Sequence, residues 1–200
     1  MINGADFYEK NIYMTNSFTR DIMEELFEGC DEVRLSKNAD LYRPGMVVKY
    51  VYWLYEGLVE VYAENENGVK QVVAYHYPDS FVGDIQSLGE EITFLTCTAI
   101  KPSRLKRCDV DIFISRLLEK NLIKPYLKLL VGKTQTNVVQ LLAISLDDCE
   151  TRINKYYNNE LTHNQLAELV GCSRVQVTRI LNKDYHKNRQ PQPQPQPPKD

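Results

Sequence analysis

A segment near the end of the chain, residues 174–183, places cationic, amide and small polar side chains at a spacing that suits contact with DNA. Arg can pair bidentately with guanine and Asn with adenine, while an apolar side chain can touch a thymine methyl group. On a helix, these side chains would lie opposite a buried stripe of Val177, Ile180 and Leu181. A capping interaction competes for the side chain of Gln176, which makes it a weaker candidate. The residues that we expect to contact DNA are Arg174, Val175, Gln176, Thr178, Arg179, Asn182 and Lys183.

Two short helices that would present this segment are marked by two capping boxes. Thr162 with Gln165 begins the first helix, and Ser173 with Gln176 begins the second. Gly171 lies between them, where a tight turn needs a residue that tolerates positive φ. Two helices separated by three residues form a helix-turn-helix pattern, which favours DNA binding. An ordinary helical hairpin with a solvated charged face fits the same spacing and stays open as the alternative.

The charge distribution separates this segment from the rest of the chain. The 200 residues carry a net charge of −3 and 43% apolar side chains, enough for one large or two small domains. Residues 1–147 have a net charge of −5, whereas residues 148–200 have a net charge of +2. We therefore expect the acidic part to stay away from DNA and the basic part to approach it.

The cysteine pattern and the hydropathy of the sequence indicate the cellular compartment. The sequence has no C-x-x-C pair, no apolar run long enough to span a membrane and no basic-then-apolar leader. These features predict a cytoplasmic protein without a membrane partner, in which the thiols are reduced and mostly buried rather than joined in a disulfide framework or bound to zinc. Cys97 and Cys108 lie on neighbouring predicted β segments and stay open as a redox pair. The five cysteines are Cys30, Cys97, Cys108, Cys149 and Cys172.

Short β segments dominate the region from Val33 to Arg107. Gly and Pro punctuate them at regular spacing, which indicates a sandwich or jelly roll. We expect a turn at Glu56–Gly57, a hairpin turn at Asn65–Gly68, and a β segment over Phe81–Leu88. Separate strands are expected over Thr93–Ile100 and Ser103–Cys108.

Helices are expected on both sides of the β region. The spacing predicts a first helix after Ser17, a short helix over Asp111–Asn121, and a long one from Pro125 to Leu146. The long helix carries an apolar stripe, which we interpret as a self-pairing dimer seam; an internal helix packed only on the jelly roll is the alternative. The expected seam residues are Leu127, Leu130, Val131, Val138, Leu141 and Leu142.

The expected organisation is α+β. Asp148 caps a further helix, and after Lys183 a polar stretch leads to a Pro-Gln repeat that can form neither helix nor sheet. The expected parts are a helical lead-in over 1–30, a β-roll over 31–110, connecting and dimerisation helices over 111–147, a helix-turn-helix over 148–184, and a disordered Pro/Gln tail over 185–200.

This order of parts resembles the catabolite-activator/fumarate-nitrate regulator (Crp/Fnr) family of bacterial transcription factors. The motifs that carry the resemblance are LYRPG at 41–45, YEG at 55–57, NG at 67–68, FVGD at 81–84, and GCSRVQVTRIL at 171–181. The resemblance covers roughly residues 33–183. It implies a cyclic-nucleotide-binding-like β-roll (jelly roll), a central dimerisation helix and a C-terminal winged helix-turn-helix that reads a palindrome.

The sequence departs from the family at the effector pocket. Cyclic-AMP-binding members resemble one another in a Gly-Glu pair and a following Arg-Ser that hold the ribose and the cyclic phosphate. Here the first pair is Gly83–Asp84, and Phe94 and Leu95 stand where the Arg-Ser should fall. A buried phosphate without a cation is poorly compensated, and Asp84 would add a like charge. We therefore expect no response to cyclic AMP, and name Gly83, Asp84, Phe94 and Leu95 as the pocket candidates.

The C-terminus departs as well. The family's wing, a β-hairpin after the recognition helix, has no recognisable counterpart after Lys183, and Val175 stands where many members carry a base-reading Glu. A family iron–sulfur cluster would need four thiolates near the N-terminus, where only Cys30 is available. His76 is the sole β-roll histidine that haem could use, and we interpret it as an ordinary strand histidine.

The predicted function is a homodimeric, sequence-specific DNA-binding regulator with an unidentified small-molecule effector, no cofactor and no metal. RNA polymerase is a further candidate partner. The alternative is an oligomeric scaffold, or a truncated regulator, that has lost operator affinity. An enzyme is not expected, because a jelly-roll enzyme of cupin type needs two or three His with a carboxylate around a metal, and the β region holds one His.

Overall fold

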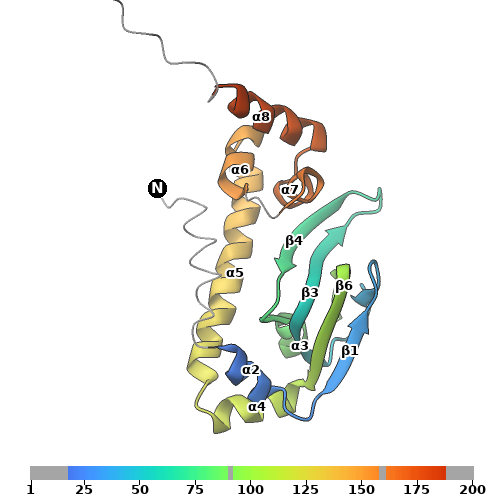
Figure 1. The fold of residues 1–200 in the computed structure, drawn as a ribbon, viewed down its shortest axis with the longest axis vertical. Helices are drawn as coiled ribbons and strands as arrows, with labels where there is room; N and C mark the ends of the chain where they lie inside the picture. The colour runs from blue at the N-terminus through green and yellow to red at the C-terminus, as the bar shows by residue number, and fades with distance from the viewer. Residues whose placement is uncertain (1–17, 90–91, 158–160, 188–200) are drawn as a thin grey trace, which may run out of the picture.

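The chain folds into a β-roll, a long helix beside it, and a group of three helices at the far end of that helix (Figure 1). The computed structural model describes residues 18–89, 92–157 and 161–187, with side chains as far as Asn182. In these ranges no helix is both long and apolar enough to cross a membrane. The α+β class expected from the sequence is confirmed.

The β-roll is one antiparallel sheet with the strand order β1-β6-β3-β4, while β2 pairs with β6 and β5 pairs with β3. Alternating apolar residues face inward, so that Leu54, Val59 and Leu105 are completely buried in its interior. The expected jelly roll is therefore present. The strands are β1 (Asp31–Leu35), β2 (Asp40–Tyr42), β3 (Tyr50–Glu64), β4 (Lys70–His76), β5 (Ser80–Val82) and β6 (Thr96–Asp109).

The turn expected at Glu56–Gly57 is wrong, because β3 runs through this position as a single strand. The register against β6 shifts here, which is the signature of a bulge. Gly57 has a φ of +104°, and the next amide, that of Leu58, donates to the hydroxyl of Ser103 at 3.1 Å. The two expected strands around Ser103 are likewise one strand, β6. Glycine here marks a bend within a strand rather than its end.

The β segment expected over Phe81–Leu88 is only partly correct. β5 ends at Val82, and Asp84–Gly89 form a short helix, α3. Gly83, with a φ of +73°, turns the chain out of the sheet, and a Cβ there would lie 3.2 Å from the ring of Tyr52. The hairpin turn at Asn65–Gly68 is confirmed, since the Gly68 amide donates to the Asn65 carbonyl at 2.9 Å.

Two helices and the first turns of a third lie at the end of the roll opposite the C-terminal helices (Figure 1). They are α2 (Arg20–Leu26), α4 (Val110–Glu119) and α5 (Ile123–Leu146). The start of α4 is fixed by the Asp109 carboxylate, which accepts a hydrogen bond from the Asp111 amide. The residue preceding α2 is Thr19; the cap expected at Ser17 lies outside the described residues, as do residues 1–16 of the expected lead-in. An aromatic cluster fills the space between these helices and the sheet: Phe18, Phe27, Trp53, Phe81, Phe113 and Tyr126.

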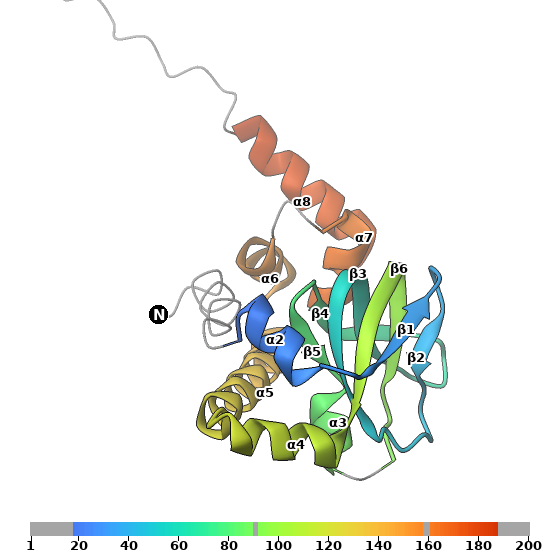
Figure 2. The same cartoon turned by 60° about the horizontal axis from the view of Figure 1, so that its bottom comes forward.

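The far end of α5 carries α6 (Cys149–Tyr156), α7 (His163–Val170) and α8 (Arg174–Lys187). Figures 1 and 2 show α7 beside β4 and α8 pointing away from the roll. The cap expected at Asp148 is present, because its carboxylate accepts from the Thr151 amide at 2.7 Å. α8 continues to Lys187, beyond the end expected near Lys183. The expected Pro/Gln tail lies outside the described residues apart from its first positions.

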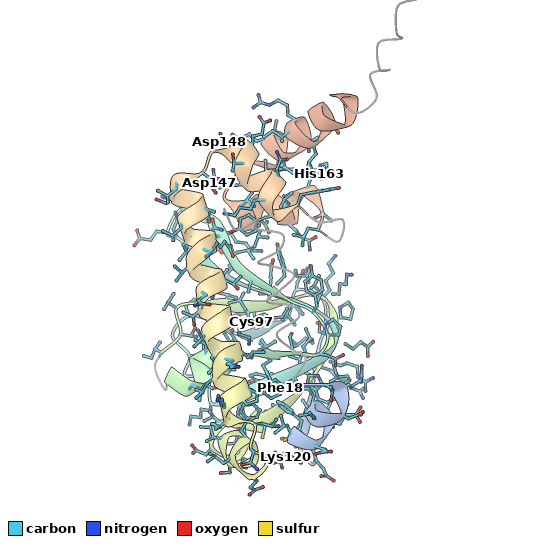
Figure 3. All side chains as sticks on the ribbon, turned by 90° about the vertical axis from the view of Figure 1, so that its left-hand side faces the viewer. Phe18, Cys97, Lys120, Asp147, Asp148 and His163 are labelled. Atoms are coloured by element: carbon cyan, nitrogen blue, oxygen red, sulfur yellow. A yellow bond between two sulfur atoms is a disulfide. The ribbon has the colours of Figure 1, made fainter. Side chains whose placement is uncertain are left out.

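The expectation that all five thiols are free is wrong. Cys149 and Cys172 are joined by a disulfide, with their Cα atoms 6.3 Å apart, within the usual range for such a bond. Folding brings these residues together across 23 positions of sequence, which no local pattern reveals. Cys97, labelled in Figure 3, and Cys108 lie at opposite ends of the same extended strand, and so cannot form the redox pair considered above.

The bulge gives a test of the β-roll. Gly57→Ala should destabilise the protein by roughly 3 kcal/mol or more, because the new Cβ would lie 2.3 Å from the Ser103 hydroxyl and 2.6 Å from the Pro102 carbonyl. Gly45→Ala is the matched control: its φ is also positive, at +88°, but nothing lies within 4 Å, so it should cost only ~1–2 kcal/mol of backbone strain. Urea unfolding measures both. Equal costs would contradict the close approach at Gly57.

Candidate nucleic-acid interface and effector pocket

The outward face of α8 carries most of the side chains that the sequence assigns to DNA contact. Arg174, Val175, Arg179 and Asn182 are exposed, and Val175 exposes 76% of its surface. Val177 and Ile180 are buried on the opposite face, as their spacing predicts. The exposed face of α8 thus carries two arginines, an asparagine and one apolar side chain, the types that can contact base edges in a major groove.

Two predicted DNA-contact side chains are engaged within the protein. The Gln176 Oε1 accepts from the Ser173 amide at 2.9 Å, while the Gln176 amide donates to the Ser173 hydroxyl at 3.2 Å, which completes the second expected capping box. The Thr178 hydroxyl lies 3.0 Å from Nδ1 of His163, the first residue of α7. Both side chains therefore hold α8 in place, and the side chain of Lys183 lies outside the described part.

The turn between α7 and α8 is fixed as the sequence predicts. Gly171 ends α7 in the left-handed conformation, with a φ of +64°, and the Cys172 amide donates to the Ala167 carbonyl at 3.0 Å. At the start of α7, Thr162 and Gln165 form the first expected capping box. Figure 3 shows His163 at this point, across the helices from Asp148 at the start of α6. Local side-chain bonds thus set the direction of α8.

The C-terminal end of α7 is held by groups that the sequence analysis missed. The Gln140 side chain, on α5, donates to the Leu169 carbonyl at 3.0 Å and to the Val72 carbonyl of β4 at 2.7 Å. Gln71 of β4 donates to the carbonyls of Glu168 and Leu169. These carbonyls have no partner within α7, so the amides complete the helix end. In the sequence, the one sign of the Gln140 contact is that this glutamine lies on the less apolar face of the expected helix.

The candidate effector pocket contains an ion pair. Asp84 is buried, and its carboxylate contacts the Lys133 ammonium group of α5 at 2.6 Å. The same ammonium group donates to the Phe81 carbonyl at 3.0 Å. No Arg or Lys lies between Asp84 and Lys101 in the β-roll, and the cation comes instead from a position 49 residues away on α5. The carboxylate is not an unpaired like charge, since α5 supplies its partner.

The other pocket candidates differ from Asp84 in their surroundings. Phe94 exposes 77% of its surface, and Leu95 is half-buried against the interior of the roll. Gly83 is buried in the turn before α3. A cyclic phosphate would need a free cation or a set of amides, but the Lys133 ammonium group is already bound to Asp84 and to a carbonyl. These residues do not fit the phosphate of a cyclic nucleotide.

Burial sets the protonation of the side chains around this ion pair. Burial and the nearby Lys133 charge lower the pKa of His76 to about 3, so the ring is neutral at physiological pH. Burial, with the Asp84 carboxylate, raises the pKa of Tyr126 well above its ordinary value. Within the described ranges no group of His, Cys, Asp and Glu is arranged to hold a metal ion.

The long helix α5 has two faces of opposite character. Its inner face packs Tyr126, Lys133 and Gln140, at intervals of seven residues, against the roll and α7. Its outer face leaves a row of apolar side chains in solvent, each at least 48% exposed: Leu127, Val131, Val138, Leu141 and Leu142. The sixth predicted seam residue, Leu130, is half-buried against the aromatic cluster.

Comparison with known proteins identifies the sheet and the overall fold. Residues 32–120 match the family model described as the cyclic nucleotide-binding domain. No curated protein sequence matches the chain. Solved structures match at low identity over most of their length. The c-di-GMP-responsive global regulator CLP of Xanthomonas campestris is 19% identical, with a TM-score of 0.63, over 83% of this chain and 91% of that one.

Two structures from Thermus thermophilus match similarly. Its catabolite activator protein is 15% identical, with a TM-score of 0.57, over 88% of this chain and 87% of that one. A CRP/FNR-family transcriptional regulator from the same organism is 18% identical, with a TM-score of 0.62, over 78% and 87%. Residues 32–120 are thus similar to the cyclic nucleotide-binding domain family, and the chain has the fold of the CRP/FNR-family regulators. The resemblance found in the sequence is confirmed at this level.

The ion pair between Asp84 and Lys133 can be tested by substitution. Lys133→Met should destabilise the protein by about 3–5 kcal/mol, because it leaves the Asp84 carboxylate buried without its cation. The double variant Asp84→Asn with Lys133→Met should recover much of that loss, since no buried charge remains. Urea unfolding near pH 7 measures both variants. If Lys133→Met alone were as stable as the wild type, the ion pair between Asp84 and Lys133 would be contradicted.

Proposed function

We propose that this chain is a homodimeric, sequence-specific DNA-binding transcriptional regulator of Crp/Fnr type, whose β-roll responds to a small molecule other than cyclic AMP. One observation carries the proposal. α8 keeps Arg174, Val175, Arg179 and Asn182 in solvent on one face while local caps hold its start. A rigid helix that presents two cations, an amide and an apolar group is suited to the major groove.

The charge of the chain supports this orientation. Residues 148–200 are net positive and the remainder is net negative, so the C-terminal helices would approach DNA first. RNA polymerase would be a further partner if the regulator activates. Lys183, just beyond the described side chains, would contact phosphate rather than a base.

Substitutions on α8 should separate base contacts from phosphate contacts. Arg179→Ala should cost about 1–3 kcal/mol of binding on a selected duplex and relax the base preference at one position per half-site. Lys183→Ala should weaken binding to all duplexes alike and lower the salt slope by about one unit. Two α8 helices related by a dimer axis would require half-sites ~10 base pairs apart.

The assay is a titration of selected and scrambled duplexes at two salt concentrations. Arg34→Ala is the matched control, because Arg34 is a strongly exposed arginine on β1, in the acidic part of the chain, and should leave binding unchanged. If the protein binds both duplexes equally, and Arg179→Ala changes only the salt slope, then Arg179 does not read bases. Absence of binding at low salt would remove the DNA-binding function.

Dimerisation is proposed from the outer face of α5. Leu127, Val131, Val138 and Leu141 recur at spacings of four, seven and three residues, which keeps them on one seam of a two-helix coiled coil. A row of this length in solvent is a typical interaction surface. The inner face is already filled by the roll and α7, so the seam is the side on which a second copy would pack.

Val138→Asp should dissociate the dimer at micromolar concentration, because it would bury an unpaired charge at the centre of the seam. Val69→Asp is the matched control: Val69 is similarly exposed, at 62%, but lies in the β3–β4 hairpin. Sedimentation measures the mass of each variant. A wild-type protein that sediments as a monomer would rule out dimerisation through α5. A Val138→Asp variant that still sediments as a dimer would rule out this row as the interface.

The effector is proposed to differ from cyclic AMP, because the pocket candidates offer no free cation for a cyclic phosphate. One structural relative, the regulator CLP, is described as responsive to c-di-GMP. Millimolar cyclic AMP should therefore leave the melting temperature unchanged. A ligand present at about 100 times its Kd would add ~2.7 kcal/mol of stability, which is readily visible. A clear upward shift would show that the pocket accepts the nucleotide.

A scaffold without operator affinity is the second candidate. The observation that favours it is that α8 continues to Lys187, through the positions directly after Lys183 where the family's wing would begin. A scaffold would keep the dimer and fail the duplex titration at low salt, which distinguishes the two functions.

A further inference from the structure

The disulfide between Cys149 and Cys172 lies at the base of the candidate DNA-binding helix. Cys172 directly precedes Ser173, whose hydroxyl accepts from the Gln176 amide in the first turn of α8. Cys149 is the first residue of α6, directly after its cap Asp148. The bond therefore ties the start of α8 to the start of α6, and through α6 to the end of α5.

The bond lies beside a surface hollow. Both cysteines are only half-buried, and Cys149 borders a hollow of about 440 Å³ together with Asp148, Glu150, Arg179 and Ile180. A small thiol or disulfide would approach Cys149 from this hollow, which residues of α6 and α8 line. Thiolates are the attacking species in such exchange, and helix N-termini favour them.

The three remaining cysteines differ in their surroundings. Cys97 and Cys108 are buried; burial raises the pKa of Cys97 well above its ordinary value, and burial together with Cys30 raises the pKa of Cys108 to about 12. Cys30 is half-buried and accepts a hydrogen bond from Arg116 at 3.3 Å. Buried thiols with raised pKa values are inert, so Cys149 and Cys172 are the pair suited to exchange.

The helices would remain folded without the bond. The Arg152 guanidinium of α6 donates to the Val170 carbonyl at 2.8 Å, and the cores of α6, α7 and α8 are continuous. The disulfide adds a covalent link between residues 23 positions apart and removes conformational freedom from the segment between them. It can therefore change how firmly α8 is held without deciding whether α8 forms.

We propose that Cys149 and Cys172 are a reversible thiol–disulfide switch that fixes α8 in its DNA-reading position when oxidised and loosens it when reduced. The oxidant is a low-molecular-weight disulfide of the glutathione class. The Cys149 thiolate attacks one sulfur of the small disulfide, whose S–S bond breaks and releases one thiolate. The Cys172 thiolate then attacks the Cys149 sulfur and releases the second. Two electrons pass to the small disulfide, and the two protein thiol protons end on the two released thiols.

The consequence for DNA rests on the proposed function. With the bond closed, part of the ordering cost of α8 has been met before binding, so the oxidised protein should bind a selected duplex roughly tenfold more tightly. With the bond open, the amides at the start of α8 should exchange hydrogen faster, by up to roughly a factor of 100. The second effect does not require DNA.

The first measurement equilibrates the full chain in glutathione buffers of graded redox ratio. Alkylation of free thiols and peptide mapping should show one reversible disulfide, between Cys149 and Cys172, with Cys97 and Cys108 remaining thiols. Cys149→Ser and Cys172→Ser should each abolish it, while the matched control Cys30→Ser should leave it intact. Absence of the 149–172 bond across the whole series would overturn the proposal.

The second measurement compares hydrogen exchange of the two forms. Faster exchange at the start of α8 in the dithiol form, and in Cys172→Ser under all conditions, is the expected result; identical exchange would overturn the switch. Duplex titration should then show tighter binding by the disulfide form, with no redox dependence in Cys172→Ser. Equal affinity, or tighter binding by the dithiol form, would also overturn it. Failure of both forms to bind DNA would contradict the proposed function alone, and hydrogen exchange would still decide the switch.

Discussion

The buried side-chain amide of Gln140 joins the three parts of this molecule. It is 3% exposed, and its Nε2 donates both to the Val72 carbonyl of the sheet and to the Leu169 carbonyl at the end of α7. A helix end docked against a sheet would otherwise bury carbonyls that have no donor, at a cost of about 1–3 kcal/mol each. Gln71 supplies a second amide from the sheet. Donors outside the C-terminal helices thus complete part of the α7 end, and Arg152 of α6 supplies a further donor from within them.

The inner face of α5 gathers three different kinds of contact at intervals of seven residues. Tyr126 packs in the aromatic cluster, Lys133 pairs with Asp84, and Gln140 bridges β4 and α7. One straight helix therefore contacts the aromatic end of the roll, the candidate effector pocket and the candidate DNA-binding helices. These contacts occupy one face of α5, and the opposite face is apolar and exposed, which suits the proposed pairing with a second copy of the chain.

The parts of the fold that local signals determine were predictable from the sequence. The capping boxes at Thr162 and Ser173 depend on residues three positions apart. Gly171 identifies the turn between the two helices. The bulge at Gly57 was not predictable, because a glycine in a strand pattern marks either a turn or a bulge, and only pairing with β6 decides which.

Contacts between distant elements were missed for a different reason. Lys133 and Gln140 look like ordinary polar positions on a long helix, and their partners Asp84 and Val72 lie 49 and 68 residues away in the chain. The Cys149–Cys172 bond has the same character. The apolar stripe of α5 predicts contacts for its outer face only. The contacts to Asp84 and to α7 come instead from polar residues of the inner face, Lys133 and Gln140.

The most direct test of this account is hydrogen exchange in Gln140→Leu. Leucine is close to glutamine in size but has no donor, so the last turn of α7, at Leu169–Gly171, should exchange faster while the β-roll strands retain their protection. Gln135→Leu, on the exposed face of α5, should leave α7 unchanged. Unaltered exchange at the end of α7 in Gln140→Leu would contradict the claim that this amide holds the C-terminal helices on the roll.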